Sequence, residues 1–217
     1  MTGTVRAASA ADAALLHELA AATFALACPP GTMPANIEDF IGRNLSEARF
    51  TEYLAQDTRE LLIAESEGVP VGYTMLVFEE PVDADVAAAL TVRPSAELSK
   101  CYLLPNQHGR GLAAMLMAAS VGVARARGVA GLWLGVNQHN ARANRFYQKS
   151  GFRIAGAKKF LVGGKWEDDF VRELVLSEWG APPQRGRELP ASALISRAKR
   201  AEVGNSAAEH AVMTPRR

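Results

Sequence analysis

The feature that most limits the fold of this sequence is a strand, a glycine-containing loop, a helix and a second strand in direct succession. Leu98–Leu104 has the composition of a strand, and Gln107–Ala113 follows it as a loop with two glycines. Gly111–Arg127 then has the apolar spacing of an amphipathic helix. Leu132–Val136 is almost continuously apolar, which is typical of a parallel strand covered on both faces. The succession therefore predicts an α/β fold with parallel strands.

The loop Gln107–Ala113 has the chemistry of an anion-binding site. The start of a helix presents unpaired backbone N–H groups and the positive end of the helix dipole. Gly109 and Gly111 lack a β-carbon, so the backbone can approach a bulky phosphate closely. Arg110 and His108 add positive charge nearby. The loop therefore predicts a site for a phosphate-bearing ligand.

Other interpretations of this loop have to be weighed. Gly109–Ala114 also satisfies the dinucleotide pattern G-x-G-x-x-A. A dinucleotide site needs an acidic residue about 20 residues further on, to hold a ribose. Residues 128–141 contain no Asp or Glu, and the strand ends in Gly135-Val136-Asn137. A glycine-containing joint without any ligand stays a second alternative for the loop taken alone.

Charge and composition exclude several classes of protein. A formal net charge of +1 and a pI of 7.8 provide no field that favours nucleic acid. Cys28 and Cys101 are too few for a disulfide framework or a zinc cluster, and they predict reduced thiols in a cytoplasmic protein that binds no metal. The apolar stretch Ala13–Cys28 contains His17 and Glu18, so it predicts an amphipathic helix rather than a signal peptide. No apolar run reaches membrane-spanning length.

The remaining elements surround this central segment. Ser9 is expected to cap the first helix, Pro29-Pro30-Gly31 to end it, and a second helical region is expected to be broken or bent in its middle. The other predicted strands are Thr4–Ala8, Glu60–Glu65, Val69–Phe78, Phe152–Val162 and Asp169–Leu176. The other predicted helices are Ile37–Gln56 and Asn140–Ser150. Turns are expected at Ser66-Glu67-Gly68 and Gly163-Gly164, and Glu79–Ser95 has no clear pattern.

The C-terminal part differs in composition from the rest. From Ala181 on, it contains Pro182-Pro183, scattered arginines and no aromatic residue. These properties predict a single domain over residues 1–178 and a flexible extension over residues 179–217. A weak helix at Ala191–Val203 would offer a contact for a homodimer.

A second motif follows the glycine loop. Asn140, Ala143, Phe146-Tyr147 and Gly151-Phe152 match the pattern N-x-x-A-x-x-F-Y-x-x-x-G-F. With the loop, this motif makes residues 98–152 resemble the acetyl-CoA-binding core of the GNAT superfamily of N-acetyltransferases. The family's Q/R-x-x-G-x-G/A pattern is opened either by Gln107, with the pattern slipped by one residue, or by Asn106 in place of the usual Gln or Arg. The looser resemblance extends over residues 4–177.

The resemblance implies the GNAT fold, an α/β (α+β) architecture. Its central mixed, twisted sheet has six to seven strands, about four flanking helices and a splayed pair of parallel strands. It also implies acetyl-CoA as co-substrate, with the pantetheine arm on Cys101–Leu104 and the pyrophosphate on the N–H groups of Gln107–Ala113. The coenzyme-binding residues implied are Tyr102, Leu103, Leu104, Gln107, His108, Gly109, Arg110, Gly111, Leu112, Ala113, Asn137, Asn140, Ala143 and Phe146. For Asn140 a helix cap is the alternative, and both roles can hold together.

The same resemblance implies catalytic roles. Tyr147 is the expected general acid, because a phenol beside the sulfur can protonate the departing thiolate; packing in the core is the alternative. The attacking amine must be neutral, and below roughly 0.1% of an alkyl ammonium is neutral at pH 7. Glu97 is the candidate base, with an exposed strand-end carboxylate as the alternative. An N–H near Leu103 or Leu104 is expected to stabilise the oxyanion.

The acceptor is the least determined part. Seven acidic residues and one tryptophan occur where the acceptor site is expected: Glu38, Asp39, Glu79, Glu80, Trp166, Glu167, Asp168 and Asp169. An acidic, aromatic cleft favours a cationic amine. The runs from Glu97, Leu132 and Phe152 also resemble bacterial spermidine/spermine acetyltransferases, so a polyamine or similar small primary amine is predicted. The alternatives are a protein N-terminus or lysine, and a non-catalytic acyl-CoA-binding sensor.

Overall fold

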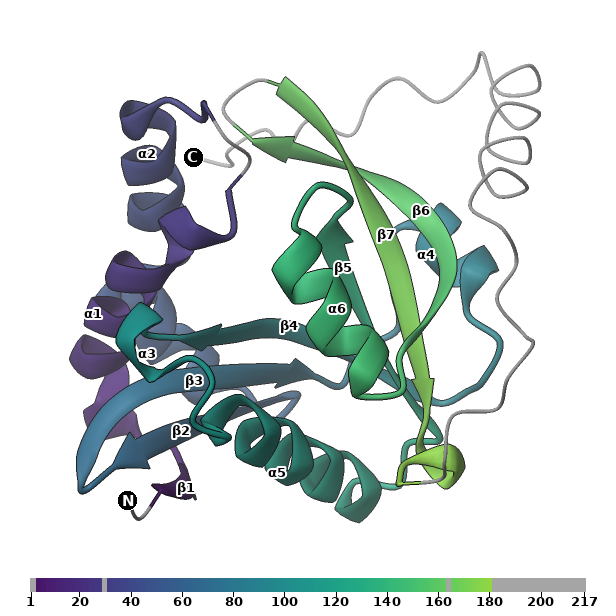
Figure 1. Cartoon of the computed structure of the whole chain (residues 1–217), viewed down its shortest axis with the longest axis horizontal. Coiled ribbons are helices and arrows are strands. Elements are labelled where there is room, and N and C mark those ends of the chain that lie inside the picture. Colours follow the sequence, from purple (N-terminus) through teal and green to yellow (C-terminus); the bar gives the residue numbers. More distant parts are fainter. Residues whose placement is uncertain (1–2, 29–30, 163–164, 181–217) are drawn as a thin grey trace, which may run out of the picture. The chain divides into compact units, whose positions relative to one another are not determined.

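The computed structural model describes residues 3–28, 31–162 and 165–180 of the 217-residue chain. They contain a seven-stranded mixed sheet in the order β1-β2-β3-β4-β5-β7-β6 (Figure 1). The strands are β1 Gly3–Ala7, β2 Arg59–Ser66, β3 Val69–Val77, β4 Ser95–Leu103, β5 Gly131–Asn137, β6 Arg153–Val162 and β7 Lys165–Val175. The α-helices are α1 Ala13–Thr23, α2 Pro34–Asn44, α3 Glu47–Leu54, α4 Ala84–Ala89, α5 Leu112–Ala126 and α6 Ala141–Lys149.

The six described α-helices exceed the predicted four for local reasons. The second helical region is broken at Leu45-Ser46, one of the two outcomes expected for its middle, because Ser46 caps α3 by accepting a hydrogen bond from the Arg49 N–H. Helix α4 forms in the segment without a clear pattern, where Asp83 caps it in the same way. Helix α1 ends at Thr23 and continues as a 3-10 turn, short of the predicted end. Pro29-Pro30, Gly163-Gly164 and residues 181–217 of the predicted C-terminal extension lie outside the described residues, whereas Trp179, at the start of the predicted extension, packs against the core.

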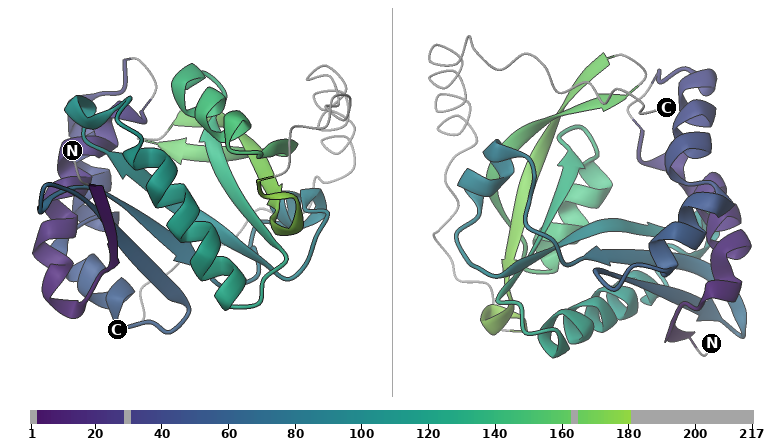
Figure 2. Two further views of the ribbon diagram at one scale, coloured as in Figure 1. Left: turned by 60° about the horizontal axis from the view of Figure 1, so that its bottom comes forward. Right: turned by 180° about the vertical axis from the view of Figure 1, so that it is seen from behind.

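The two faces of the sheet are covered by different helices (Figure 2). Helices α1 and α3 pack on the face formed by Ile63, Tyr73 and Met75, which are fully buried. Helix α5 packs on the opposite face, through Leu116 on one core cluster and Met117 on another. Burial on both faces accounts for the apolar strands, since each buried large aliphatic side chain contributes about 1.5–3 kcal/mol.

Strands β1 to β4 form an antiparallel half of the sheet. The β2–β3 turn has positive φ at both Glu67 (53°) and Gly68 (79°), which is the backbone of a type I′ hairpin, in agreement with the sequence. In β4, Leu98 pairs with Leu76 and Lys100 with Met75, so Ser99 is an extra residue in a β-bulge. This bulge decides which side chains of β4 share a face.

The parallel pair β4–β5 is joined over a short length only. The register runs from Ser95 opposite Gly131 to Glu97 opposite Trp133, and no pairs follow. Beyond this point β4 remains paired with β3, and β5 remains paired with β7. Their facing edges therefore separate, which is the splayed parallel pair expected from the sequence. Among the helices that the structure describes, none has both the length and the apolar character to cross a lipid bilayer.

Candidate active site

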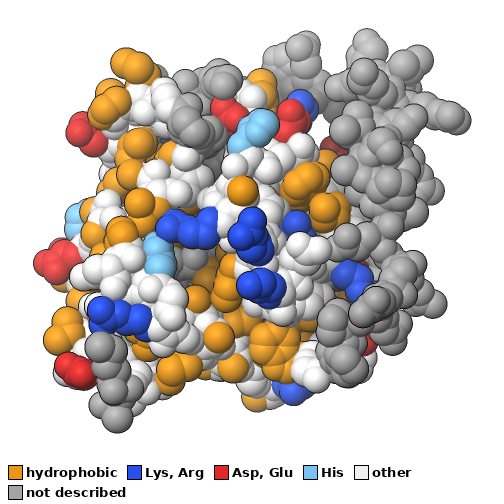
Figure 3. All heavy atoms as spheres, in the orientation of Figure 1, with side chains coloured by type: hydrophobic (Ala, Val, Ile, Leu, Met, Phe, Trp, Pro, Cys, Tyr) orange, Lys and Arg blue, Asp and Glu red, His pale blue; other side chains and the backbone are white. Residues whose placement is uncertain are grey.

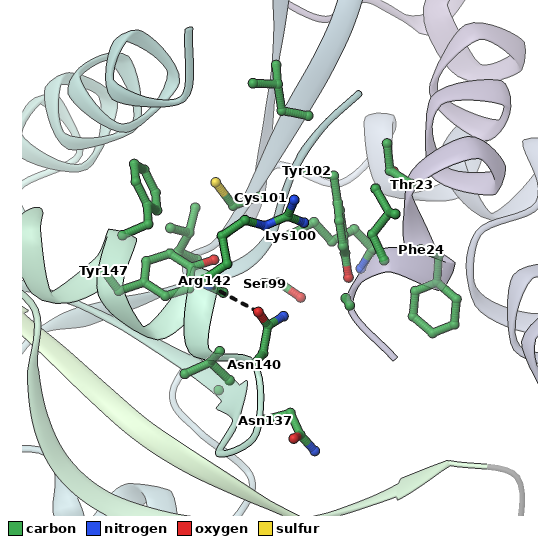
Figure 4. A pocket seen from close by; sticks show the side chains of 18 of the residues that line it. Thr23, Phe24, Ser99, Lys100, Cys101, Tyr102, Asn137, Asn140, Arg142 and Tyr147 are labelled. Atoms are coloured by element: carbon green, nitrogen blue, oxygen red, sulfur yellow. Dashed lines mark hydrogen bonds between the residues drawn. The ribbon is translucent and has the colours of Figure 1, made fainter. Parts of the chain in front are cut away.

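A cavity of about 470 Å³ opens where β4 and β5 separate. Its walls come from β4, β5, the turn after α1, the loop before α5, helix α6 and the β6–β7 hairpin. Figure 4 shows that Tyr147 on α6 and Thr23 and Phe24 at the end of α1 lie on opposite sides of the β4 side chains. The volume is that of a small-molecule site, in which a few polar groups fix the ligand's orientation.

The edge of β4 offers backbone groups to this cavity. Leu104 donates its N–H to Val71 O at 2.9 Å, so its main chain is directed toward β3. Backbone groups of successive strand residues point to opposite edges, so those of Cys101 and Leu103 point into the gap. Leu104 is thus excluded as the oxyanion donor, and the alternative at Leu103 remains. The sequence alone did not reveal which of the two faced the gap.

The glycine loop has the expected anion-binding form. Gly109 and Gly111 have φ values of 79° and 84°, the left-handed region in which a β-carbon is strained. Among the described residues, the main-chain N–H groups of Gly109, Gly111, Leu112 and Ala113 have no hydrogen-bond partner. They lie at the N-terminus of the 15-residue helix α5. Together they form the helix-start site that favours phosphate.

Two residues of the loop differ from the prediction. Gln107 donates its N–H to Leu104 O at 3.0 Å, and His108 donates its N–H to Pro105 O at 3.3 Å. The N–H groups that can hold a pyrophosphate therefore begin at Gly109 rather than at Gln107. The side chain of Gln107 is turned inward, and its Oε1 is buried without a partner among the residues described.

His108 connects the loop to α6 instead of supplying a cation. Its Nε2 lies 3.0 Å from Leu103 O, and its Nδ1 lies 2.9 Å from Arg142 Nη1. A carbonyl accepts and a guanidinium donates, so Nε2 carries the proton and the imidazole is neutral. The positive charge expected at His108 is therefore supplied by Arg142, a residue that the sequence analysis missed. Figure 3 shows Lys and Arg side chains gathered near the middle of the face that is turned to the viewer in Figure 1.

The start of α6 places two asparagines beside the gap. Asn140 caps the helix, since its Oδ1 accepts from the Ala143 N–H at 3.0 Å. Asn137 Oδ1 accepts from the His139 N–H at 2.9 Å. The cap role weighed for Asn140 is confirmed, and its amide nitrogen has no partner in the described part of the chain. Asn137, Asn140 and Ala143 all line the cavity.

Tyr147 lies at the coenzyme side of the cavity. Its ring packs against Phe146 and Phe152 at centroid distances of 5.4 and 5.7 Å, and Tyr147 lines the cavity together with Cys101. Burial raises the pKa of Tyr147 well above its ordinary value, so the phenol keeps its proton. Burial also raises the pKa of Cys101 to about 12, which keeps the thiol protonated. Packing and a proton-donating role are compatible in this geometry.

The opposite face of β4 carries charged side chains. Glu97 and Lys100 pair with Val77 and Met75, whose side chains belong to the core under α1 and α3. Tyr102 shares this face, with its ring 5.6 Å from that of Tyr73, so its side chain points away from Cys101. Glu97 is half-buried and lines the cavity, so it is not the exposed strand-end carboxylate that the sequence offered as an alternative. Burial raises the pKa of Glu97, and Lys158 and Lys100 oppose this.

The predicted acidic residues are only partly brought together. Glu167 and Asp169 line the cavity, and burial raises the pKa of Asp169 to about 6. Lys158, which sequence reasoning missed, lies opposite Asp169 on β6. The other five acidic residues pair elsewhere or do not line the cavity: Glu38, Asp39 with Arg43, Glu79 with Arg59, Glu80 with Arg93, and Asp168 with Lys159. Trp166 is 63% exposed. No group of three potential metal ligands occurs in the described ranges.

Comparison with known proteins agrees with this geometry. The model of the acetyltransferase (GNAT) family matches residues 24–152. Proteins of Mycobacterium tuberculosis and Mycobacterium bovis, described as uncharacterized N-acetyltransferases, are 48% identical over 166 residues, which is 76% of this chain and 99% of each relative. A PaiA N-acetyltransferase of Thermoplasma acidophilum, solved in complex with coenzyme A, has a TM-score of 0.64 at 20% identity and covers 81% of this chain and 99% of that one.

A further solved structure, a ribosomal-protein-alanine N-acetyltransferase of Brucella melitensis, has a TM-score of 0.59 at 25% identity and covers 79% of this chain and 99% of that one. The separating parallel strands and the helix start with unpaired N–H groups form a site suited to an extended co-substrate that carries a phosphate. The chain belongs to the acetyltransferase (GNAT) family and is an acetyl-CoA-dependent N-acetyltransferase. The superfamily, fold class and co-substrate predicted from the sequence are confirmed.

Proposed function

We propose that this chain transfers the acetyl group of acetyl-CoA directly to a primary amine, with Tyr147 as general acid and Glu97 as general base. The observation that carries the proposal is their placement on opposite faces of β4 in one cavity. A protonated phenol lies on the side of α6, and a half-buried carboxylate with a raised pKa lies on the side of α1. Acid and base are thus separated by the strand edge to which the thioester would bind.

The coenzyme would be held by main-chain groups. The pyrophosphate is proposed to bind the N–H groups of Gly109, Gly111, Leu112 and Ala113, and Arg142 would contribute positive charge. The pantetheine arm is proposed to pair with the backbone of Cys101 and to contact the amide of Asn140, since the Leu103 carbonyl is engaged by His108 and the Leu103 N–H is left for the oxyanion. Tyr102 would shape the cavity wall on the side of α1, while Gln107 and Leu104 do not line the cavity and would support the loop and strand from outside it. Ala143 and Phe146 would form its apolar wall.

The reaction needs two proton transfers. The amine nitrogen attacks the thioester carbon, a carbon–nitrogen bond forms, and the carbon–sulfur bond breaks. Glu97 would take the proton of the amine, directly or through a water molecule, and the Leu103 N–H would stabilise the oxyanion. Tyr147 would give its proton to the sulfur as it leaves. A raised pKa makes the Glu97 carboxylate a stronger base and brings its pKa closer to neutral pH, where a general base works best.

The acceptor prediction is refined by the charges in the cavity. Glu97, Glu167 and Asp169 would attract a cationic amine, as the polyamine hypothesis requires. Lys100 and Lys158 lie in the same cavity and would repel a second ammonium group of a polyamine. The mixed charge favours a small acceptor with one amine. Acetylation of a protein N-terminus is the second candidate, supported by the 25% identical structure named as a ribosomal-protein-alanine N-acetyltransferase.

The direct test is release of free thiol from acetyl-CoA by the purified chain, measured with and without amines. The panel contains monoamines, polyamines and N-terminal peptides, and each product is identified by mass spectrometry. We expect amine-dependent thiol release with at least one small monoamine. Binding of acetyl-CoA without transfer to any amine or peptide would favour the non-catalytic sensor instead.

A further inference from the structure

The ammonium of Lys100 is placed unusually for a charged group. Lys100 follows the β-bulge at Ser99 and lines the cavity on the same face as Glu97 (Figure 4). Its Nζ lies 5.1 Å from the centroid of the Tyr53 ring. Within the described residues it forms no hydrogen bond or ion pair. Lys100 is half-buried, so its ammonium loses part of its hydration without gaining an acceptor from the described residues. A ligand that supplies an acceptor would make up for this loss.

The surroundings of Lys100 are positive. Arg49 and Arg59 also contact the Tyr53 ring, with their Cζ atoms 5.1 and 4.9 Å from its centroid. Three cations therefore surround a single phenol ring. The Nε of Arg49 is buried without a partner in the described part of the chain. Arg49 is ion-paired with Glu52, and Arg59 lies 4.0 Å from Glu79. Lys100 has no ion-pair partner among the described residues and is the one cation of the three that lines the cavity, so the uncompensated charge of the cluster lies at Lys100.

The second lysine of the cavity is compensated by carboxylates. Lys158 lies opposite Asp169 in the β6–β7 register, and its side chain crosses Gly135, where a β-carbon would stand 2.7 Å from Lys158 Cε and 3.4 Å from Asp169 Oδ2. The positive charge of Lys158 also attracts the Glu97 carboxylate and partly offsets the burial that raises the pKa of Glu97. The acceptor side of the cavity thus has a negative part around Asp169 and Glu97 and a positive part at Lys100. A ligand complementary to both parts carries charges of both signs.

We propose that Lys100 binds a carboxylate of the acceptor, so that the substrate class is a small amino acid whose amine points to Glu97. This inference rests on the acetyl transfer proposed above and adds the class of acceptor. Lys100 would then be a specificity-determining residue. A carboxylate would receive charge-assisted hydrogen bonds from an ammonium that has no other acceptor in the described structure. A polyamine would place an ammonium against the Arg49, Arg59 and Lys100 cluster.

The experiment compares amines that differ only in the carboxylate. The pairs are β-alanine and ethylamine, γ-aminobutyrate and propylamine, and lysine and cadaverine. Thiol release from acetyl-CoA gives kcat and KM for each member. We expect the wild type to prefer the amino acid by roughly 10- to 100-fold in kcat/KM in at least one pair, mainly through KM, the range of one charged hydrogen bond.

Three variants identify the source of the preference. Lys100→Met is expected to remove it by raising KM for the amino acid, with little change for the decarboxylated amine. Lys100→Arg keeps the charge and is expected to retain part of the preference. Lys159→Met is the matched control, since Lys159 is the neighbour of Lys158, is exposed, and pairs with Asp168 at 2.6 Å. Acetyl-CoA affinity, measured by calorimetry, verifies that each variant is folded.

The outcomes separate the two proposals. A wild type that acetylates both members of every pair equally, or a Lys100→Met variant that slows both equally, overturns the carboxylate site and leaves acetyl transfer intact. A wild type that releases no thiol with any amine overturns the proposed function and this inference together. Preference for spermidine over every amino acid also contradicts the inference.

Discussion

Replacing Lys100 with methionine is expected to stabilise the coenzyme-free protein at neutral pH. Burial lowers the pKa of Lys100 from 10.5 to about 8, Glu97 opposes this, and Arg59 and Arg49 reinforce it. A lowered pKa means that the folded protein holds this proton less tightly than the unfolded chain does. The protonated ammonium therefore costs folding free energy, although its side chain contacts the Tyr53 ring.

The size of the effect follows from the pKa difference. Each pKa unit corresponds to about 1.4 kcal/mol, so the ammonium of Lys100 destabilises the folded state by on the order of 3 kcal/mol below pH 8. Methionine removes this cost and loses a cation–π contact of about 0.5–1 kcal/mol, which leaves a net gain of about 2 kcal/mol. As pH rises from 8 to 10.5 the folded protein releases the proton first, so the cost and the gain both decline.

The assay is urea unfolding of both proteins at pH 7 and at pH 9.5. The free energy of unfolding of Lys100→Met should exceed that of the wild type by about 2 kcal/mol at pH 7, and the excess should shrink by a similar amount at pH 9.5. Lys159→Met, which removes an exposed ammonium, should show neither effect. A Lys100→Met variant that is less stable at pH 7, or whose excess does not change with pH, would refute the reasoning.

Three further predictions concern the coenzyme loop, the base and the first strand. Gly111→Ala places a β-carbon at a φ of 84°, so about 1 kcal/mol of strain should weaken coenzyme A binding about five-fold in calorimetry, while unchanged affinity would contradict the loop assignment. Glu97→Gln should lower kcat by about 10²- to 10⁴-fold and abolish the rise of kcat/KM as Glu97 loses its proton; a retained limb in the pH–rate profile would exclude Glu97 as base. Arg6 holds the pKa of Asp12 below its usual range, so this stabilisation is present at neutral pH and is lost as pH falls. Asp12→Asn should lower the free energy of unfolding at pH 7 by about 1–3 kcal/mol. The variant should also lose less stability than the wild type as pH is lowered, and an equal loss in both proteins would contradict a stabilising Arg6–Asp12 ion pair.

The parts of the site that depend on local spacing were predictable from the sequence. Positive φ at Gly109 and Gly111 is encoded in the residue type, and Asn140 and Tyr147 are seven positions apart on one short helix. Glycine and asparagine carry their conformational preferences into any fold that contains them. Residue type and spacing therefore predicted the loop and the cap before any tertiary contact was known, and the resemblance of the second motif to the family supplied the candidate acid.

The charges of the acceptor side were not predictable, because a bulge determines them. Simple alternation from Glu97 would place Ser99 and Cys101 on its face and Lys100 on the other. The extra residue Ser99 reverses this order and brings Lys100 to the face of Glu97. A lysine within the otherwise uncharged run Leu98–Leu104 was the one available signal. The contacts between His108 and Arg142 and between Lys158 and Asp169 depend on strand order, which spacing does not reveal.

Single-turnover acetyl transfer by Tyr147→Phe tests the central claim most directly. At saturating amine, the rate should fall by about 10²- to 10⁴-fold, the contribution of a positioned general acid, while the Kd for acetyl-CoA stays within about two-fold. Tyr73→Phe is the control. It removes a buried hydroxyl that has no partner among the described residues, on the face of β3 that packs against α1 and α3, and it should keep the wild-type rate. A Tyr147→Phe enzyme as fast as the wild type would contradict the assignment of the proton donor.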